Sequence, residues 1–279
     1  MNSNHRRYHT VLTIGHSDPA GASGIQADVK TIAAFGCYPC TVVSAIWSRF
    51  RTGSDSLLHL DTDSVLQQCE QASGKHVPGA IKIGLVGCAK TASSIASFLS
   101  GFERVPVLLD PVFARLSDTD CTPDLQQVSD VFLTSILPHV TLLLPSVPEA
   151  EYLTGTRIRD GDDMERAART LLDAGPKAVL LKGGKSKRAH SDDVLAYRSP
   201  GEPVTYTWFH SGRVREYSGS GAGSTLSSAI AAGLARGKSI RDASEDAKIF
   251  LTAALRAGSQ IRFDSESGGI HHFYAWWNE

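Results

Sequence analysis

Short runs of apolar, often β-branched residues alternate along this chain with stretches in which apolar residues recur at helical spacing. Such alternation is typical of strand–helix–strand crossovers, which build a mostly parallel sheet. The apolar runs predict strands at 10–15, 41–47, 80–86, 105–111, 141–144 and 178–182, and a helix is expected after each of them. The pattern therefore predicts an α/β protein.

The segment at 160–174 shows the helical spacing most clearly, and a Gly-Pro pair at 175–176 ends it. The apolar residues of its one face are Met164, Ala167, Ala168, Leu171 and Leu172. After Lys182 the chain changes character. The segments DVLAYRS, PVTYTWFH and RVREYS alternate apolar and polar residues, which predicts antiparallel strands at one edge of the sheet.

Composition and charge narrow the class of protein. The 279 residues, 42% of them hydrophobic, suit one large core, and no Pro/Gly/Ser-rich linker divides them, so residues 1–279 are expected to form a single domain. A formal net charge of -1 gives no field that would attract nucleic acid or an anionic membrane, so a small molecule is the expected partner. The polar start MNSNHRRYHT favours a cytoplasmic protein without a signal peptide or spanning helix.

Three motifs are set aside. Five cysteines are too few and scattered for a disulfide framework, and the CxxC of Cys37 and Cys40 lacks further zinc ligands at suitable spacing, so reduced thiols are expected. GGKS at 183–186 lacks the earlier glycine of a P-loop, because Val179 stands there. GSGAGS at 219–224 ends in Ser224 instead of the last glycine of a dinucleotide-binding motif.

The segment 218–232, SGSGAGSTLSSAIAA, is the strongest candidate for a functional site. A glycine-rich run passes directly into an alanine-rich helical pattern. The first amides of a helix have no partner within the helix, so such a start can bind anions. Gly219, Gly221 and Gly223 would let a phosphate approach the backbone, where the helix dipole favours negative charge. A glycine-rich turn that only caps a buried helix is the alternative.

Seven segments occur in an order that resembles a known family. They are LTIGHSDPAGASGIQADVKTIAAFGCY, IKIGLVG, LLDPVFA, LLPSVPEAEYLTG, VLLKGG, GSGAGSTLSSAIAAGLARG and HHFYAWW. Together they resemble the ribokinase-type small-molecule kinases, and most closely the hydroxymethylpyrimidine and phosphomethylpyrimidine kinases. The resemblance implies a ribokinase-like fold, with a mostly parallel central sheet, flanking helices and a few antiparallel edge strands. It also implies ATP and Mg²⁺ as cofactors, a heteroaromatic alcohol as substrate, and a homodimer.

The same resemblance implies roles for individual residues. Asp28 falls where the family's acid closes the pyrimidine pocket, Val112 matches an apolar wall of that pocket, and Leu85 stands where family members often carry methionine.

On the nucleotide side, Asp110 and Glu149 match acids near the phosphates and the magnesium shell, although no side chain is expected to ligate the metal directly. Lys182 lies in the strand that leads to the nucleotide, and SVPE at 146–149 replaces the usual NLPE. An aspartate after an apolar strand often only caps a turn, so that role stays open for Asp110.

The chain also departs from the family pattern. Ser224, with Gly221, Ala222 and Gly223 before it, occupies the position of the catalytic cysteine or aspartate, yet a serine hydroxyl is too weak a base without help. His16 is a candidate helper.

Four further departures lie in the expected substrate pocket: His16 for glycine, Ser23 for alanine, Trp47 for a small aliphatic residue, and Arg49 for the glutamine that pairs with the pyrimidine. Arginine only donates hydrogen bonds, whereas glutamine also accepts them. The alternative is that His16 and Arg49 point to solvent.

The predicted function is ATP-dependent phosphorylation of hydroxymethylpyrimidine or its phosphate, in the pyrimidine branch of thiamine biosynthesis. A catalytically silent ligand-binding or regulatory relative is the alternative from another class, and the serine at the base position favours it. A pyridoxal-type kinase is a third hypothesis on the same scaffold.

Overall fold

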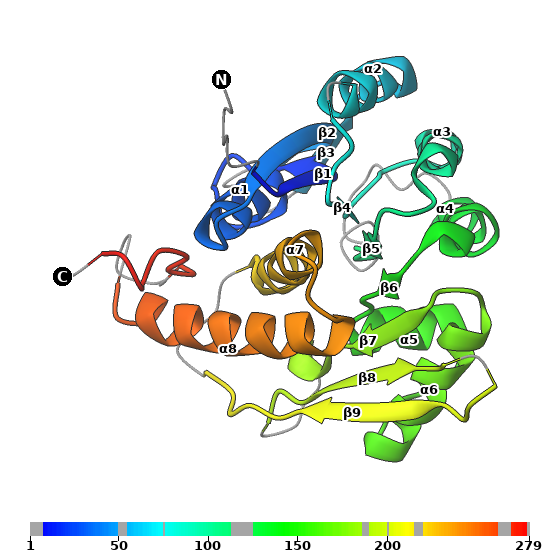
Figure 1. Ribbon diagram of the computed structural model, residues 1–279, viewed down its shortest axis with the longest axis vertical. Helices are drawn as coiled ribbons and strands as arrows, with labels where there is room; N and C mark the ends of the chain where they lie inside the picture. Colours follow the sequence, from blue (N-terminus) through cyan, green and yellow to red (C-terminus); the bar gives the residue numbers. More distant parts are fainter. Residues whose placement is uncertain are drawn as a thin grey trace, which may run out of the picture.

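The structure is a computed structural model that describes residues 8–49, 55–74, 76–112, 125–185, 190–199, 201–214, 220–261 and 269–277. Within these residues one nine-stranded sheet runs in the order β3-β2-β1-β4-β5-β6-β7-β8-β9 (Figure 1). The six central strands, β2, β1, β4, β5, β6 and β7, are parallel to one another. At the two edges, β3 pairs antiparallel with β2, and β8 and β9 continue the sheet antiparallel from β7. The predicted α/β class with a mostly parallel sheet is confirmed.

The strands follow the predicted apolar runs with different ends. Their bounds are β1 (Thr10–Ser17), β2 (Tyr38–Arg49), β3 (Asp55–His59), β4 (Ala80–Ile83), β5 (Val107–Leu109), β6 (Leu142–Leu143), β7 (Ala178–Leu181), β8 (Asp193–Tyr197) and β9 (Thr205–Phe209). Four of the predicted runs are longer than the strands they contain. Buried apolar residues continue past the last paired residue at the ends of β4 and β6, as Leu85 and Leu144 show.

Helices cover both faces of the sheet. Figure 1 shows α1, α7 and α8 on one side and α2 to α6 on the other. Their bounds are α1 (Gly24–Ala34), α2 (Thr62–Ser73), α3 (Ala89–Leu99), α4 (Leu125–Val131), α5 (Val147–Thr154), α6 (Gly161–Asp173), α7 (Ala222–Ala235) and α8 (Ile240–Gly258). A π-helical turn, Phe132–Ile136, continues α4. Within the described part of the chain, no helix has the length and apolar character needed to cross a bilayer.

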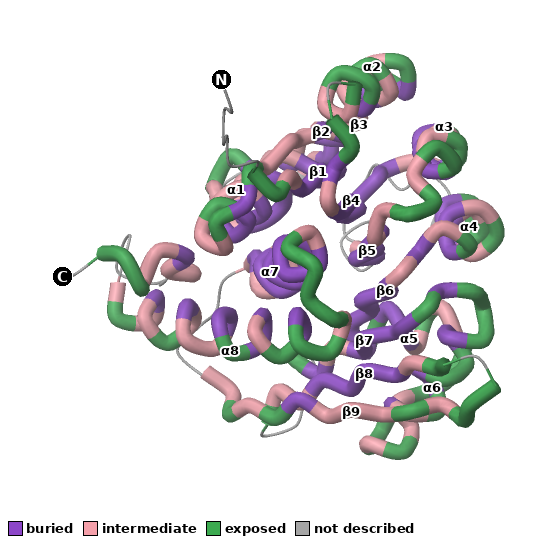
Figure 2. The backbone as a smooth tube through the Cα atoms, in the orientation of Figure 1, coloured by how far each residue is buried: buried purple, intermediate pink, exposed green. Residues whose placement is uncertain are grey.

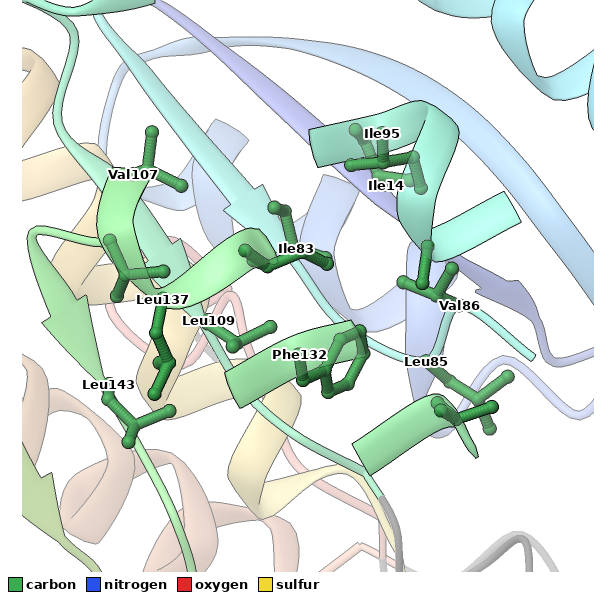
Figure 3. Close-up of a cluster of buried hydrophobic side chains, with 14 of the residues drawn as sticks. Ile14, Ile83, Leu85, Val86, Ile95, Val107, Leu109, Phe132, Leu137 and Leu143 are labelled. Atoms are coloured by element: carbon green, nitrogen blue, oxygen red, sulfur yellow. The ribbon is translucent and has the colours of Figure 1, made fainter. Parts of the chain in front are cut away.

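The core has two halves because successive strand residues point to opposite faces of the sheet. Leu109, Leu143 and Leu181 belong to the half under α2 to α6, part of which Figure 3 shows. Their neighbours Leu108 and Leu142 belong to the half under α7 and α8. Apolar contact on both faces explains the continuous apolar runs of the parallel strands. The helix α7 is buried on nearly all sides (Figure 2).

Several expectations about single elements can be compared with the structure. The helix at 160–174 is confirmed as α6, with Asp160 as its N-cap and all five predicted apolar residues buried. The expectation of a helix after every strand is wrong for β2, where the next described element is the strand β3, and for β7, which runs through a 3-10 turn (Gly183–Lys185) to β8. Arg213 and Val214, the described part of the predicted strand RVREYS, are not in a strand, and the remainder, 215–218, lies outside the described residues.

Candidate functional site

A cavity of about 740 Å³ opens at the carboxyl ends of the parallel strands. Asp110 and Lys182, which follow β5 and β7 directly, line it, as does His16 near the end of β1. Ligands of open α/β sheets bind at this end. The cavity brings together ten of the residues predicted from the sequence: His16, Ser23, Asp110, Val112, Glu149, Lys182, Gly221, Ala222, Gly223 and Ser224.

The start of α7 forms one wall of the cavity. Gly221 is the N-cap of α7 with φ of +104°, and a Cβ atom on it would lie 1.8 Å from the carbonyl oxygen of Ala22. Only glycine fits this contact between α7 and the loop before α1. Gly221 to Ser224 all line the cavity, and the first turn of α7 carries no acidic residue. A helix start of this kind favours a bound anion.

A buried ion pair lies beside this helix start. Lys182 Nζ pairs with Asp110 Oδ1, and the Ser227 hydroxyl donates to Asp110 Oδ2 at 3.1 Å. Burial alone would raise the pKa of Asp110, but Lys182 and Lys82 hold it below its usual value. Burial alone would lower the pKa of Lys182, but the charges of Asp110 and Glu149 raise it above its usual value. The pair is therefore charged, with a cation near the helix start.

Glu149 lies on the cavity wall but is bonded to its own helix. The Ser146 amide donates to Glu149 Oε2 at 2.7 Å, as part of the capping box of α5, and the Ser146 hydroxyl donates to the same oxygen at 2.6 Å. Ser146, the serine of SVPE, thus has a structural role as the cap of α5, which the sequence analysis did not predict. Glu149 can still offer its other carboxylate oxygen to the cavity.

The sequence did not single out a second ion pair on the cavity wall. Lys248 Nζ of α8 lies 2.7 Å from Asp193 Oδ2 at the start of β8, and the Gly183 amide donates to Asp193 Oδ1 at 2.8 Å. Burial raises the pKa of Asp193, although Lys248 opposes this. One signal was present in the sequence, because Lys248 stands among the apolar residues of the buried face of α8. A charge at such a position indicates a partner.

The predicted substrate side of the cavity contains a short hydrogen-bonded chain. Ser23 Oγ donates to Asp18 Oδ2 at 2.7 Å and lies 3.3 Å from His16 Nε2. The His16 ring lies 5.7 Å from the ring of Trp47. Hydrogen bonds from Ser23 hold the pKa of Asp18 below its usual value although burial would raise it. His16 is buried against these neighbours, so the alternative that it points to solvent is wrong.

Ser224 faces the same region. Its Oγ accepts a hydrogen bond of 3.3 Å from the amide of Gly24, the residue after Ser23. The hydroxyl is therefore held between the first loop and the start of α7. The Gly24 amide is a donor, so this contact supplies no base to activate the hydroxyl.

Three predicted site residues with described side chains, Asp28, Leu85 and Trp47, do not line the cavity. Asp28 is fully buried between Lys82 Nζ at 2.7 Å, Thr13 Oγ1 at 2.6 Å and Ser228 Oγ at 2.7 Å. Leu85 belongs to the core cluster of Figure 3, and Trp47 lies beside His16. The side chain of Arg49 lies outside the described part of the structure. Their substrate contacts stay predictions.

A comparison with known proteins identifies the family. The model of the phosphomethylpyrimidine kinase family matches residues 18–271. The chain belongs to this family. It is 33% identical over 270 residues to the hydroxymethylpyrimidine/phosphomethylpyrimidine kinase of Rhizobium meliloti, with 96% of this chain and 98% of the relative covered. The resemblance recognised from seven ordered segments is confirmed.

Solved structures of phosphomethylpyrimidine and pyridoxal kinases share the fold. The Staphylococcus aureus pyridoxal kinase in complex with AMP-PCP and pyridoxal gives a TM-score of 0.84 at 28% identity, covering 97% of this chain and 96% of that one. The phosphomethylpyrimidine kinase of Clostridium difficile 630 gives 0.73 at 31% identity, covering 88% and 100%. The ribokinase-like fold predicted from the resemblance is confirmed.

The cavity offers oxygen ligands that suit the Mg²⁺ expected with ATP in a phosphomethylpyrimidine kinase. Asp110 and Glu149 both line it, and Mg²⁺ commonly binds through one or two carboxylates, phosphate oxygens and several waters. No cluster of three or more His, Cys, Asp or Glu side chains suited to a metal occurs in the part of the chain that the structure describes. The donor set fits an ion held mainly by a nucleotide.

Proposed function

We propose that the chain is one kinase domain that transfers the γ-phosphoryl group of ATP to hydroxymethylpyrimidine or its phosphate, in the pyrimidine branch of thiamine biosynthesis. One observation supports a kinase most directly. The start of α7 faces a cavity that also holds the Lys182–Asp110 pair, so backbone amides and a cation converge on one space. Membership of the phosphomethylpyrimidine kinase family supports the choice of substrate.

The proposed reaction is an in-line displacement. The substrate hydroxyl oxygen attacks the γ-phosphorus atom while the bond to the β-phosphate oxygen breaks and ADP leaves. The amides of Gly221 to Ser224 stabilise the charge on the transferred group, and Lys182 stabilises the phosphates from the other side. Asp110 holds the Lys182 ammonium in place. Positioning and charge stabilisation supply most of the catalysis in reactions of this type.

Magnesium belongs to the proposal as part of Mg-ATP. Asp110 and Glu149 would hold the ion through its water ligands, and phosphate oxygens of ATP would bind it directly. When bound, the ion neutralises charge on the phosphates.

The proton of the substrate hydroxyl needs an acceptor, and we assign His16 to help Ser224 in this role. His16 lines the same cavity as Ser224. Ser23 connects its ring to the Asp18 carboxylate, which would stabilise a protonated imidazole. Histidine commonly accepts protons near neutral pH. This arrangement favours an active kinase over a silent relative.

A pyridoxal-type kinase remains the second candidate because of one specific observation. The TM-score with the Staphylococcus aureus pyridoxal kinase, 0.84, exceeds the 0.73 with the Clostridium difficile phosphomethylpyrimidine kinase. The two substrates are both heteroaromatic alcohols, so kinases of the same fold can serve either reaction.

A mass-resolved assay tests these alternatives. Mg-ATP is mixed with hydroxymethylpyrimidine, its monophosphate or pyridoxal in separate reactions, with a reaction lacking alcohol as the control for ATP hydrolysis. A phosphorylated pyrimidine supports the proposal, and phosphorylated pyridoxal alone replaces it with the second candidate. Nucleotide binding without any product would favour the silent relative. The expected homodimer and cytoplasmic location stay predictions.

A further inference from the structure

The C-terminal motif HHFYAWW has a place in the structure but no role in the mechanism above. His272, its second residue, is buried with 3% exposure. Its Nε2 lies 3.0 Å from Thr225 Oγ1, and Thr225 is fully buried. Thr225 directly follows Ser224 in the first turn of α7. The end of the chain therefore contacts the turn that faces the cavity.

The C-terminal segment 269–277 is docked firmly enough to hold this contact. The His271 amide donates to the Ala254 carbonyl of α8 at 3.1 Å. A Cβ atom on Gly258 would lie 1.8 Å from the Gly269 carbonyl oxygen, so the segment packs directly on the α8 backbone. The Tyr274 ring lies 5.7 Å from that of Phe250. Figure 1 shows the segment at the end of α8, on the side of α1.

The contact also adjoins the first loop of the cavity. Burial first, and then the charge of Lys30, lower the pKa of His272 to about 4. The imidazole is therefore neutral at physiological pH and can form a hydrogen bond in either direction with the hydroxyl. Lys30 Nζ donates to the Gly21 carbonyl at 2.6 Å. Lys30 thus acts electrostatically on His272 and is also bonded to the loop before α1.

The hydrogen bond of Thr225 differs from the usual one for a helical threonine. Such a hydroxyl commonly bonds the carbonyl four residues earlier. Thr31 does so in α1, where its Oγ1 donates to Ala27 at 2.7 Å. Thr225 is instead paired with His272, while its amide donates to Gly221 at 2.8 Å. One residue thereby links the C-terminal segment to the phosphate-facing turn.

We infer that the segment 269–277 is a latch that sets the position of the turn Gly221–Thr225, with His272 as a positioning residue that acts through Thr225. The inference rests on the proposed function, because it assigns this turn to the transferred phosphoryl group. A turn held on one side by the Ala22 contact and on the other by His272 presents its amides in a fixed direction. Preorganised donors of this kind contribute to the rate without reorganising during the reaction.

The test compares variants that remove or keep the hydrogen bond. Thr225→Val and His272→Phe should each lower kcat about tenfold and change the KM of the alcohol by less than about threefold, because a displaced donor affects the transition state most. Thr225→Ser keeps the hydroxyl and should therefore keep the wild-type kcat. His271→Ala, at the neighbouring histidine, is the matched control and should keep it. The double variant should be no slower than either single variant, since both remove one contact.

A second readout separates this inference from the proposed function. Calorimetric titration with AMP-PCP needs no turnover, and Thr225→Val should weaken its binding at a temperature where the protein stays folded. If the wild type phosphorylates none of the three alcohols, the proposed substrate class fails, and weaker AMP-PCP binding by Thr225→Val still supports the latch. Wild-type kcat and AMP-PCP affinity in folded Thr225→Val would overturn the latch alone.

Discussion

Replacing Lys182 with methionine would leave the Asp110 carboxylate buried without its main cation. The two side chains are 11% and 4% exposed, so solvent screens the pair weakly. Breaking a buried ion pair from one side commonly costs about 3–5 kcal/mol. The Ser227 hydroxyl at 3.1 Å and the nearby charge of Lys82 still stabilise Asp110. We therefore expect the lower end, about 3 kcal/mol, or a Tm lower by roughly 6–12 °C.

The loss of stability in Lys182→Met should depend on pH. The folded pKa of Asp110 lies below its usual value, so this carboxylate contributes stability above its unfolded pKa of about 4 and loses it as the pH falls through the folded pKa. Without Lys182 the pKa of the buried carboxyl rises, and protonation then relieves the unpaired charge. The difference in unfolding free energy between wild type and Lys182→Met should be largest at neutral pH and should decrease at acidic pH.

Urea unfolding at pH 7 and pH 4.5 measures this difference. Asp110→Asn and the double variant complete a mutant cycle, in which the double variant should lose less than the two single losses combined. Lys182→Met should also lower the transfer rate, because it removes the cation near the helix start. A variant within about 1 kcal/mol of wild type at pH 7, or an equal loss at both pH values, would refute a charged, buried pair.

Three further predictions concern the cavity wall. Ser224→Cys should raise kcat at least about tenfold, since a thiol at a helix start has a lowered pKa and accepts a proton more readily; steady-state kinetics that show no gain contradict the assignment of the base position. His16→Gln should lower kcat about a hundredfold and remove the acid limb of the pH profile, and an unchanged profile excludes His16 as proton acceptor. Gly221→Ala should cost about 1–3 kcal/mol more than Gly201→Ala by urea unfolding. Both positions have positive φ, but only the first places Cβ 1.8 Å from the Ala22 oxygen, and equal losses would exclude that clash.

The sheet was predictable where strands are buried on both faces, and less so elsewhere. The parallel strands appear as continuous apolar runs, and α6 shows its period plainly. The strand β3 was missed because, among its residues 56–59, only Leu57 is buried, while Leu58 is 64% exposed. Its pairing with the end of β2 depends on a tertiary contact that five residues do not encode by themselves. The change after β7 to a 3-10 turn likewise depends on Gly183, whose Cβ would lie 2.0 Å from the Asp192 oxygen.

The site was predictable where one short segment carries the chemistry. The glycine run before α7 indicated an anion site without any knowledge of the fold. Ion pairs between distant segments gave no such signal. Lys248 and Asp193 lie 55 positions apart, and Asp28 meets Lys82 across 54. A single sequence shows each charge but not its partner, so the buried network of Asp28 with Lys82 was not predicted.

Three of the departures expected in the substrate pocket, His16, Ser23 and Trp47, are joined by contacts. His16 Nε2 lies 3.3 Å from Ser23 Oγ, its ring lies 5.7 Å from Trp47, and Ser224 Oγ accepts a hydrogen bond from Gly24, the residue after Ser23. Residues in contact do not contribute independently to stability or binding. Alanine at position 23 would remove the hydroxyl that links His16 to Asp18, so the histidine and the serine belong together. If the pocket had lost its use, its residues would have changed independently of one another, and matched contacts between them would not be expected. The contacts among these residues therefore favour an active kinase with an altered substrate pocket over a relative that has lost its activity.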